Sequence, residues 1–283
     1  MFAIVGIVLV FGAVIGGYLM EHGNLKVLLQ PAELLIIAGA AAGTVLVANP
    51  PAVLKGILEG LRAVFGSSKF GKALYQDVLK QMYFLMQAAR KQGLNELEND
   101  VENPAKSKIF SKWDHHLQNF VCDTLRMAMT GGPTPFELDQ MMEVDMEVHH
   151  HTSNQPVNAL NTVADSLPGL GIVAAVLGVV ITMQALGGPP EEIGHKVAAA
   201  LVGTFLGILL CYGLLGPMAS KMGKAAEEEG QFYHVVRLAL IAFLKGASPL
   251  VAIEFGRRAV PGHIRPSFQE LEKALKGKEP AAT

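Results

Sequence analysis

Four long apolar runs, separated by polar segments, set the pattern of the chain. They cover residues 2–20, 31–49, 167–186 and 197–216. A helix needs about 20 predominantly apolar residues to cross the hydrocarbon core of a bilayer, and each run has close to that length. The first, third and fourth runs contain no Asp, Glu, Lys, Arg or His. The pattern therefore predicts an all-α, polytopic membrane protein with four transmembrane helices.

Two long polar regions lie between and after these runs, at 50–166 and 217–283. Within them, residues 71–92 and 136–154 carry apolar side chains every three to four positions, which is typical of helices. The segment Phe232–Lys245 is apolar on most faces, but charges interrupt it. We expect it to pack on other helices outside the membrane. The polar regions are thus predicted to form a large helical domain and a set of C-terminal helices.

Lysine and arginine indicate the orientation of the chain. Eleven lie in 52–166 and ten in 218–283, which leaves only Lys26 and Lys196 for the two short turns. Basic residues close to the membrane ends stay on the cytoplasmic side. Both large polar regions and the N-terminus are therefore predicted to be cytoplasmic. The residues from Pro261 onward are expected to form a loose tail.

Composition excludes several classes of function. Only 17% of residues are charged, mean hydropathy is +0.34 and the formal net charge is −2. No basic excess exists to neutralise phosphates, so no nucleic-acid partner is expected. Cys122 and Cys211 lie in different predicted compartments, which argues against a disulfide, and no metal-type cysteine spacing occurs. Neither a phosphate-binding glycine loop nor a GxSxG motif is present, so we expect no enzyme, catalytic residue or cofactor.

Two prolines mark the ends of the third and fourth runs. Pro168 is predicted in the first helical turn, where a missing N–H costs little. It is either an ordinary helix start or a stiff junction that transmits movement. Pro217 falls where the fourth helix should continue, and it is expected to free the carbonyl of Gly213 and kink the helix.

Three side chains in the apolar runs have candidate roles. Thr204 either bonds its own preceding carbonyl, the usual behaviour of threonine in membrane helices, or holds a water or ion. Thr182 has a weaker claim to the same role. Glu33 is a functional candidate because an intramembrane carboxylate is costly. Its place at the edge of the second run favours a wet, surface position.

Two further patterns have structural interpretations. Glycines at 39–43, 171–178 and 203–207 place small residues along helix faces, where they let membrane helices approach closely. The triplet His149-His150-His151 cannot close one metal site, because neighbouring side chains on a helix point about 100° apart. We interpret the triplet as a solvated helix end and expect no metal.

The runs DSLPGLGIVAAVLGVVITM, at 165–183, and VGTFLGILLCYGLLGPM, at 202–218, strongly resemble the MotA family of bacterial flagellar stator subunits. The order of four spans, the two short turns and the large polar loop match that family over nearly the whole chain. The more distant relatives ExbB and TolQ have three spans and a different N-terminal orientation, which fit this chain badly.

The resemblance implies roles for particular residues. Pro168 and Pro217 match prolines near the ion path that are thought to couple ion flow to movement. Thr204 matches a pore-side threonine that faces the partner's essential aspartate. Ala175 and Gly203 stand where sodium-driven relatives tend to carry threonine, so the resemblance favours proton selectivity.

The resemblance also implies partners and a location. Arg90 and Glu98 match the charged positions that face the rotor protein FliG, although a charged helix–helix turn is the simpler interpretation of the residues alone. The family forms a homo-oligomeric ring around MotB, which supplies the proton-carrying aspartate, in the bacterial inner membrane. An energiser of another envelope system, of the ExbB/TolQ type, is the alternative function. A self-contained transporter would need more intramembrane ionisable residues than Glu33.

Overall fold

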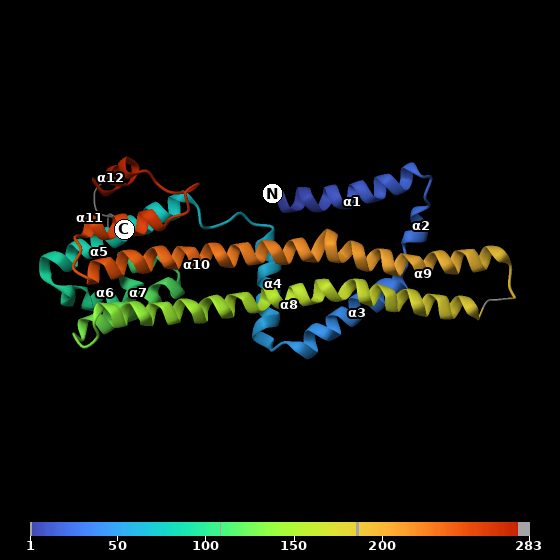
Figure 1. The fold of residues 1–283 in the computed structure, drawn as a ribbon, viewed down its shortest axis with the longest axis horizontal. Coiled ribbons are helices and arrows are strands. Elements are labelled where there is room, and N and C mark those ends of the chain that lie inside the picture. The colour runs from blue at the N-terminus through green and yellow to red at the C-terminus, as the bar shows by residue number, and fades with distance from the viewer. Residues whose placement is uncertain (1, 108, 185–186, 277–283) are drawn as a thin grey trace. The chain divides into compact units, whose positions relative to one another are not determined.

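The computed structural model describes residues 2–107, 109–184 and 187–276, and no strand occurs among them. Four helices in this part of the chain are long and apolar enough to span a membrane, which confirms the all-α, four-span prediction. The α-helices are α1 Phe2–Met20, α2 Leu25–Leu28, α3 Pro31–Ala48, α4 Pro51–Val64, α5 Lys72–Gln92, α6 Glu98–Glu102, α7 His115–Met129, α8 Pro135–Met183, α9 Pro190–Leu210, α10 Gly216–Leu244, α11 Pro249–Ala259 and α12 Phe268–Lys276 (Figure 1).

Tighter or wider turns join several of these helices. Three short 3₁₀ helices, η1 Leu94–Leu97, η2 Pro104–Lys106 and η3 Phe110–Lys112, lie between α5 and α7. A π-helical turn, η4 Cys211–Leu215, joins α9 to α10. The chain divides into two units, and each is described by itself. The first comprises residues up to Ser67 with Ser153–Ala225, and the second comprises Ser68–Thr152 with the residues from Ala226 onward.

Helix α8 corrects the prediction for Pro168. The helix runs without a break through 49 residues, so Pro168 lies in its interior and not in its first turn. An interior proline supplies no N–H to the carbonyl four residues earlier, here that of Ala164. Apolar periodicity continues through the proline, and this continuity outweighs the local preference for a helix start. The predicted end of the third run, at 185–186, lies outside the described residues.

The first unit has two apolar clusters. One contains Ile37 and Ala41 of α3 with Ala164, Leu167 and Ala174 of α8. The other joins one face of α4 to α8 and α10; its buried members are Val53, Ile57, Val64, Val157, Ala159, Leu160, Met218, Ala219 and Met222. Helix α1 has no buried residue within the chain. Its apolar surface is therefore left for lipid or for another protein chain.

The second unit has one large core built from α5, α7, α11 and parts of α8 and α10. Phe232, Val236 and Leu240 of α10 are buried in it, so the expectation that 232–245 packs on other helices is confirmed. Burial raises the pKa of the Cys122 thiol to about 12, which makes it unreactive. Both cysteines are free.

Residues 268–276 differ from the prediction of a loose tail. Residues 268–276 form α12, and Leu271 is buried against the core of the second unit. A capping box begins the helix, because Glu270 accepts a hydrogen bond from the N–H of Ser267 at 2.7 Å. The loose-tail prediction is therefore wrong for these residues, and the part at 277–283 lies outside the described residues.

Candidate functional site

Small residues bring α8 and α9 into close contact. A Cβ atom on Gly171 would lie 2.7 Å from the carbonyl oxygen of Gly203 and 3.2 Å from Cα of Gly207. A Cβ atom on Gly207 would lie 2.5 Å from the carbonyl oxygen of Leu167. Figure 1 shows α9 running alongside the C-terminal part of α8. The packing role predicted for these glycines is confirmed, and we name this contact the α8–α9 seam.

Glycines of α3 differ from those of the seam. A Cβ atom on Gly39 or Gly43 would meet no described atom of the chain within 4 Å. Close packing was predicted for these two glycines as well, and within this chain that prediction is wrong. Helix periodicity alone does not show which face of a helix packs against another helix. The glycines of α3 and those of the seam therefore cannot be told apart in the sequence.

Three of the four residues that the resemblance assigns to the ion path and its coupling lie on the two helices of the seam, and Pro217 lies outside it. A Cβ atom on Gly203 would lie 3.3 Å from the backbone nitrogen of Ala175, and one on Gly171 would lie 3.3 Å from Cα of Thr204. Ala175 and Thr204 are both half-buried. Pro168 directly follows Leu167, whose backbone packs on Gly207. Gly207 lies about one helical turn after Gly203 and Thr204 in α9. The geometry thus places Pro168, Ala175 and Thr204 along one helix pair.

The two threonines differ in their hydrogen bonds. The hydroxyl of Thr182 donates to the carbonyl oxygen of Gly178, four residues earlier in α8, at 2.8 Å. It is therefore satisfied by its own helix, as is usual for membrane threonines. Within the described ranges, the hydroxyl of Thr204 makes no such bond. Thr204 is the better candidate for contact with a water or ion.

Glu33 is buried against the seam, which corrects the expectation of a wet surface position. Its exposed fraction is 7%, although it belongs to the first turn of α3. Oε2 would lie 2.7 Å from a Cβ atom on Gly203, and Oε1 would lie 3.4 Å from one on Gly178. The carboxyl group therefore occupies space left by two missing side chains. The position of Glu33 in the sequence shows how far along α3 it lies. It does not show that other helices cover the face of α3 that carries it.

The backbone changes helix type just before Pro217, where the sequence predicts a kink. The N–H of Gly216 donates to the carbonyl of Cys211, five residues earlier, and residues 211–215 form the π-helical turn η4. A single π turn accommodates an irregular register, and such turns are frequent at functional sites. Pro217 is exposed at the start of α10. The proline therefore lies directly after a local irregularity in the backbone.

Arg90 and Glu98 lie on either side of a tight corner. Helix α5 ends at Gln92. Gly93 caps it with a φ of 93° and donates its N–H to the carbonyl oxygen of Ala89. Arg90 and Glu98 are both exposed. No ion pair joins them among the residues described. Nη1 of Arg90 donates to the carbonyl oxygen of Gly246 at 3.3 Å, so part of its hydrogen-bonding capacity is used within the chain.

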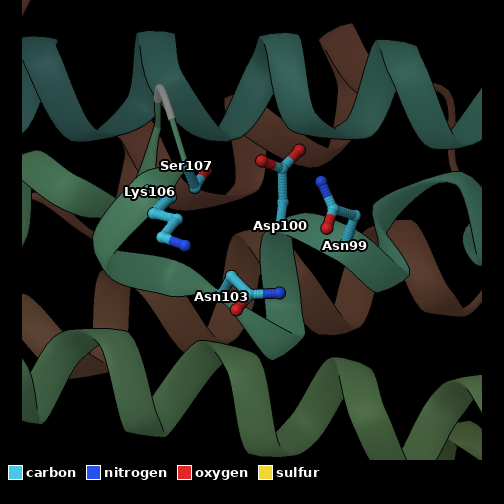
Figure 2. A pocket seen from close by; sticks show the side chains of 5 residues that line it. All are labelled: Asn99, Asp100, Asn103, Lys106 and Ser107. Atoms are coloured by element: carbon cyan, nitrogen blue, oxygen red, sulfur yellow. The ribbon is translucent and has the colours of Figure 1, made fainter.

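A small polar hollow lies beside this corner. It measures about 140 Å³, and Figure 2 shows it surrounded by the side chains of Asn99, Asp100, Asn103, Lys106 and Ser107. Ser107 is buried, and its hydroxyl accepts hydrogen bonds from the N–H groups of Ile109 and Phe110. It therefore stabilises the turn into η3. Among the described residues, no hydrogen bond joins the Ser107 hydroxyl to Asp100 or Lys106.

The histidine triplet has a different setting from the one predicted. It lies inside α8, and His149 forms an ion pair with Glu229 at 3.3 Å. Its ring also packs on the rings of His116 and Tyr233. The prediction of a solvated helix end is therefore wrong for His149, because the facing helix α10 covers it. Among the described residues, no group of three or more His, Cys, Asp or Glu is placed to hold a metal.

These features define a membrane protein with four apolar helices, in which α8 and α9, the third and fourth spans, pack against each other through small residues. Residues 4–93 match the motility protein A N-terminal family, and residues 112–234 match the MotA/TolQ/ExbB proton channel family. Motility protein A of Escherichia coli is 41% identical over 98% of this chain and 95% of its own length. Chemotaxis protein LafT of Vibrio parahaemolyticus is 37% identical over 97% of this chain and 98% of its own.

Solved structures agree with this fold. A C. jejuni MotAB structure matches with a TM-score of 0.78, at 20% identity, over 94% of this chain and 98% of the solved chain. The flagellar MotAB stator complex of Bacillus subtilis matches with a TM-score of 0.75, at 23% identity, over 96% and 98%. The chain belongs to the motility protein A family, within the MotA/TolQ/ExbB proton channel family.

Proposed function

We propose that the chain is a stator subunit of the bacterial flagellar motor. In this proposal it forms a ring in the inner membrane, with both large polar regions in the cytoplasm, and it works with a MotB partner. The observation that carries the proposal is the α8–α9 seam, which packs Gly203 against Ala175 and Gly171 against Thr204. The chain is also 41% identical to motility protein A of Escherichia coli. The two solved structures with the same fold are of MotAB and of a MotAB stator complex, and they support the same partner.

The partner is proposed to supply the carboxylate that carries the proton through the ring. The apolar stretches of α8 and α9 that form the seam hold no ionisable side chain. Cys211 lies in the π-helical turn that follows α9. Moving one charge through 100 mV releases roughly 2.3 kcal/mol. Protonation of a partner aspartate would remove a costly buried charge and change which ring position it favours. In the assembled stator, the seam then serves as the wall of the ion path.

The residues that line the seam also favour protons over sodium ions as the transported ion. Ala175 and Gly203 carry no hydroxyl where sodium-driven members of the family tend to have threonine. A sodium ion needs several oxygen ligands to replace its water shell, whereas a proton needs a titratable group and a water path. Replacing sodium with potassium at constant pH should leave rotation unchanged. Rotation that stops without sodium would contradict proton selectivity.

Torque is proposed to pass through the corner that carries Arg90 and Glu98. The two charges are exposed, and no ion pair joins them among the described residues. Complementary charges across an interface set orientation and encounter more than affinity, which suits repeated transient contacts with the rotor protein FliG. Pro168 and Pro217 would connect the ion path to this region, since each interrupts the regular hydrogen bonding of its helix.

Swimming speed in a strain deleted for its own copy of this chain tests the proposal. Reintroducing the chain with its partner should restore swimming. An envelope energiser of the ExbB/TolQ type, the alternative function, would leave swimming absent although the protein reaches the membrane. The match of residues 4–93 to the motility protein A N-terminal family favours the stator. A partner with one membrane span and a peptidoglycan-binding domain would favour it further.

A further inference from the structure

Glu33 is the one charged residue that is buried among the residues described. It reaches from α3 into the space beside Gly178 and Gly203, one glycine on each helix of the seam. Ala200 and Ala174 line the same space, because a Cβ atom on Gly178 would lie 2.7 Å from Cβ of Ala200 and one on Gly203 would lie 3.1 Å from Cβ of Ala174. The surroundings of the carboxyl group are therefore small and apolar.

One oxygen of this carboxyl group has no partner. Oε2 is fully buried and makes no hydrogen bond within the described part of the chain. Buried polar groups in proteins nearly always have a partner, so each exception needs an explanation. An ionised carboxylate in such a place is costly, and the neutral acid costs less. Ionisable residues inside membrane segments are rare and usually mark ion pathways.

The position also has one feature that favours the ionised form. Glu33 follows Pro31 in the first turn of α3. The positive end of the helix dipole stabilises a negative charge in that turn. Burial and the dipole thus act in opposite directions on a charge at this carboxyl group. A group that transfers protons repeatedly needs this balance.

We propose that Glu33 is a proton-binding group in the wall of the ion path, held beside the partner's carboxylate by the gaps at Gly178 and Gly203. This inference rests on the proposed function. The neutral Glu33 acid gives its proton to the partner's carboxylate, which becomes neutral, while Glu33 becomes a carboxylate. Water at the end of the path near the short α8–α9 connection then supplies a new proton. One proton moves in each step, and no electrons are transferred.

Proton flux into vesicles that contain the complete complex with its partner tests this role. Glu33→Gln keeps the shape of the side chain but cannot release a proton, so flux should fall by about 10²-fold, the lower end of what one positioned proton donor contributes. Glu33→Asp should retain part of the flux. Glu191→Gln is the matched control, because Glu191 lies exposed in the first turn of α9. That variant should conduct like the unaltered complex.

The outcomes separate this inference from the proposed function. If the unaltered complex conducts no protons, the proposed function fails. If the unaltered complex and Glu33→Gln conduct equally at equal assembly, only the role of Glu33 is overturned.

A measurement on the unaltered complex covers the case in which Glu33→Gln does not assemble. A hydrophobic carbodiimide adds to a protonated carboxyl group and rearranges to a stable N-acylurea, with no leaving group. Mass spectrometry should find the adduct on Glu33 and not on Glu191, and flux should fall as the adduct forms. Absence of the adduct on Glu33, or an adduct that leaves flux unchanged, would overturn the inference.

Discussion

Glu33 and Gly203 share one space: a Cβ atom on Gly203 would lie 2.7 Å from Oε2 of the Glu33 carboxyl group. Contacts this short do not persist, so a larger residue at 203 requires the carboxyl group to move. The identity of residue 33 therefore constrains the identity of residue 203. This link joins α3 to the wall that α8 and α9 form.

A double-mutant cycle measures this link. Gly203→Ala should destabilise the protein by about 1–3 kcal/mol, because it overpacks a filled site. Glu33→Ala opens that site, so the double variant should be more stable than the sum of the single effects predicts, by about 0.5–3 kcal/mol. The melting temperature of the purified protein in detergent reports both quantities. Strict additivity of the two substitutions would contradict the shared space.

Replacement of Pro168 should stabilise the helix and impair function. Pro168→Ala restores an N–H in the interior of α8, where proline costs about 3 kcal/mol relative to alanine. We expect a higher melting temperature together with loss of swimming, because the interruption is proposed to transmit movement. Pro156→Ala is the control in the same helix and should retain swimming. If Pro168→Ala swims normally, the coupling role is wrong.

Charge reversal at the corner should impair swimming without loss of protein from the membrane. Arg90→Glu and Glu98→Lys each place the wrong sign on an exposed site. Like charges brought together across an interface are unfavourable, so rotor contacts should weaken. Lys91→Glu is the matched control, because Lys91 is exposed next to Arg90. An opposite reversal on the rotor should restore swimming, and equal loss in the control would argue against a specific contact.

The pair of His149 and Glu229 should give the second unit a pH-dependent stability. The hydrogen bond with Glu229 raises the pKa of His149 above its ordinary 6.5, and the charges of Asp145 and Asp114 act in the same direction. Because the folded pKa is raised, the stabilisation is complete below about pH 6.5 and is lost as pH rises through the folded value.

Thermal unfolding at several pH values checks this prediction. Glu229→Gln should be less stable than the unaltered protein at low pH, by about 1 kcal/mol or less, and the difference should disappear at high pH. A difference that grows as pH rises would contradict the assignment.

The sequence pattern predicts where the helices of this protein lie better than it predicts which helices pack against each other. Apolar runs of membrane-spanning length give α1 and α3 nearly to the residue. The same pattern misplaces Pro168, because a proline favours a helix start locally while packing on both sides keeps α8 continuous.

Burial at the candidate site depends on contacts that no single helix encodes. Glu33 lies near a helix end in the sequence, yet the glycines that admit its side chain belong to two other helices. His149 likewise becomes half-buried because α10 supplies Glu229 and Tyr233. Periodicity identifies an apolar face, but it does not reveal a polar side chain received by a gap in a distant segment.

Proton flux through vesicles tests the central claim most directly, since the chain is proposed to form the wall of an ion path whose main carrier belongs to its partner. Three preparations are compared: the chain alone, the chain with its partner, and the chain with a partner whose membrane aspartate is replaced by asparagine. We predict flux only in the second preparation, with ring assembly in all three. Flux through the chain alone would contradict the account.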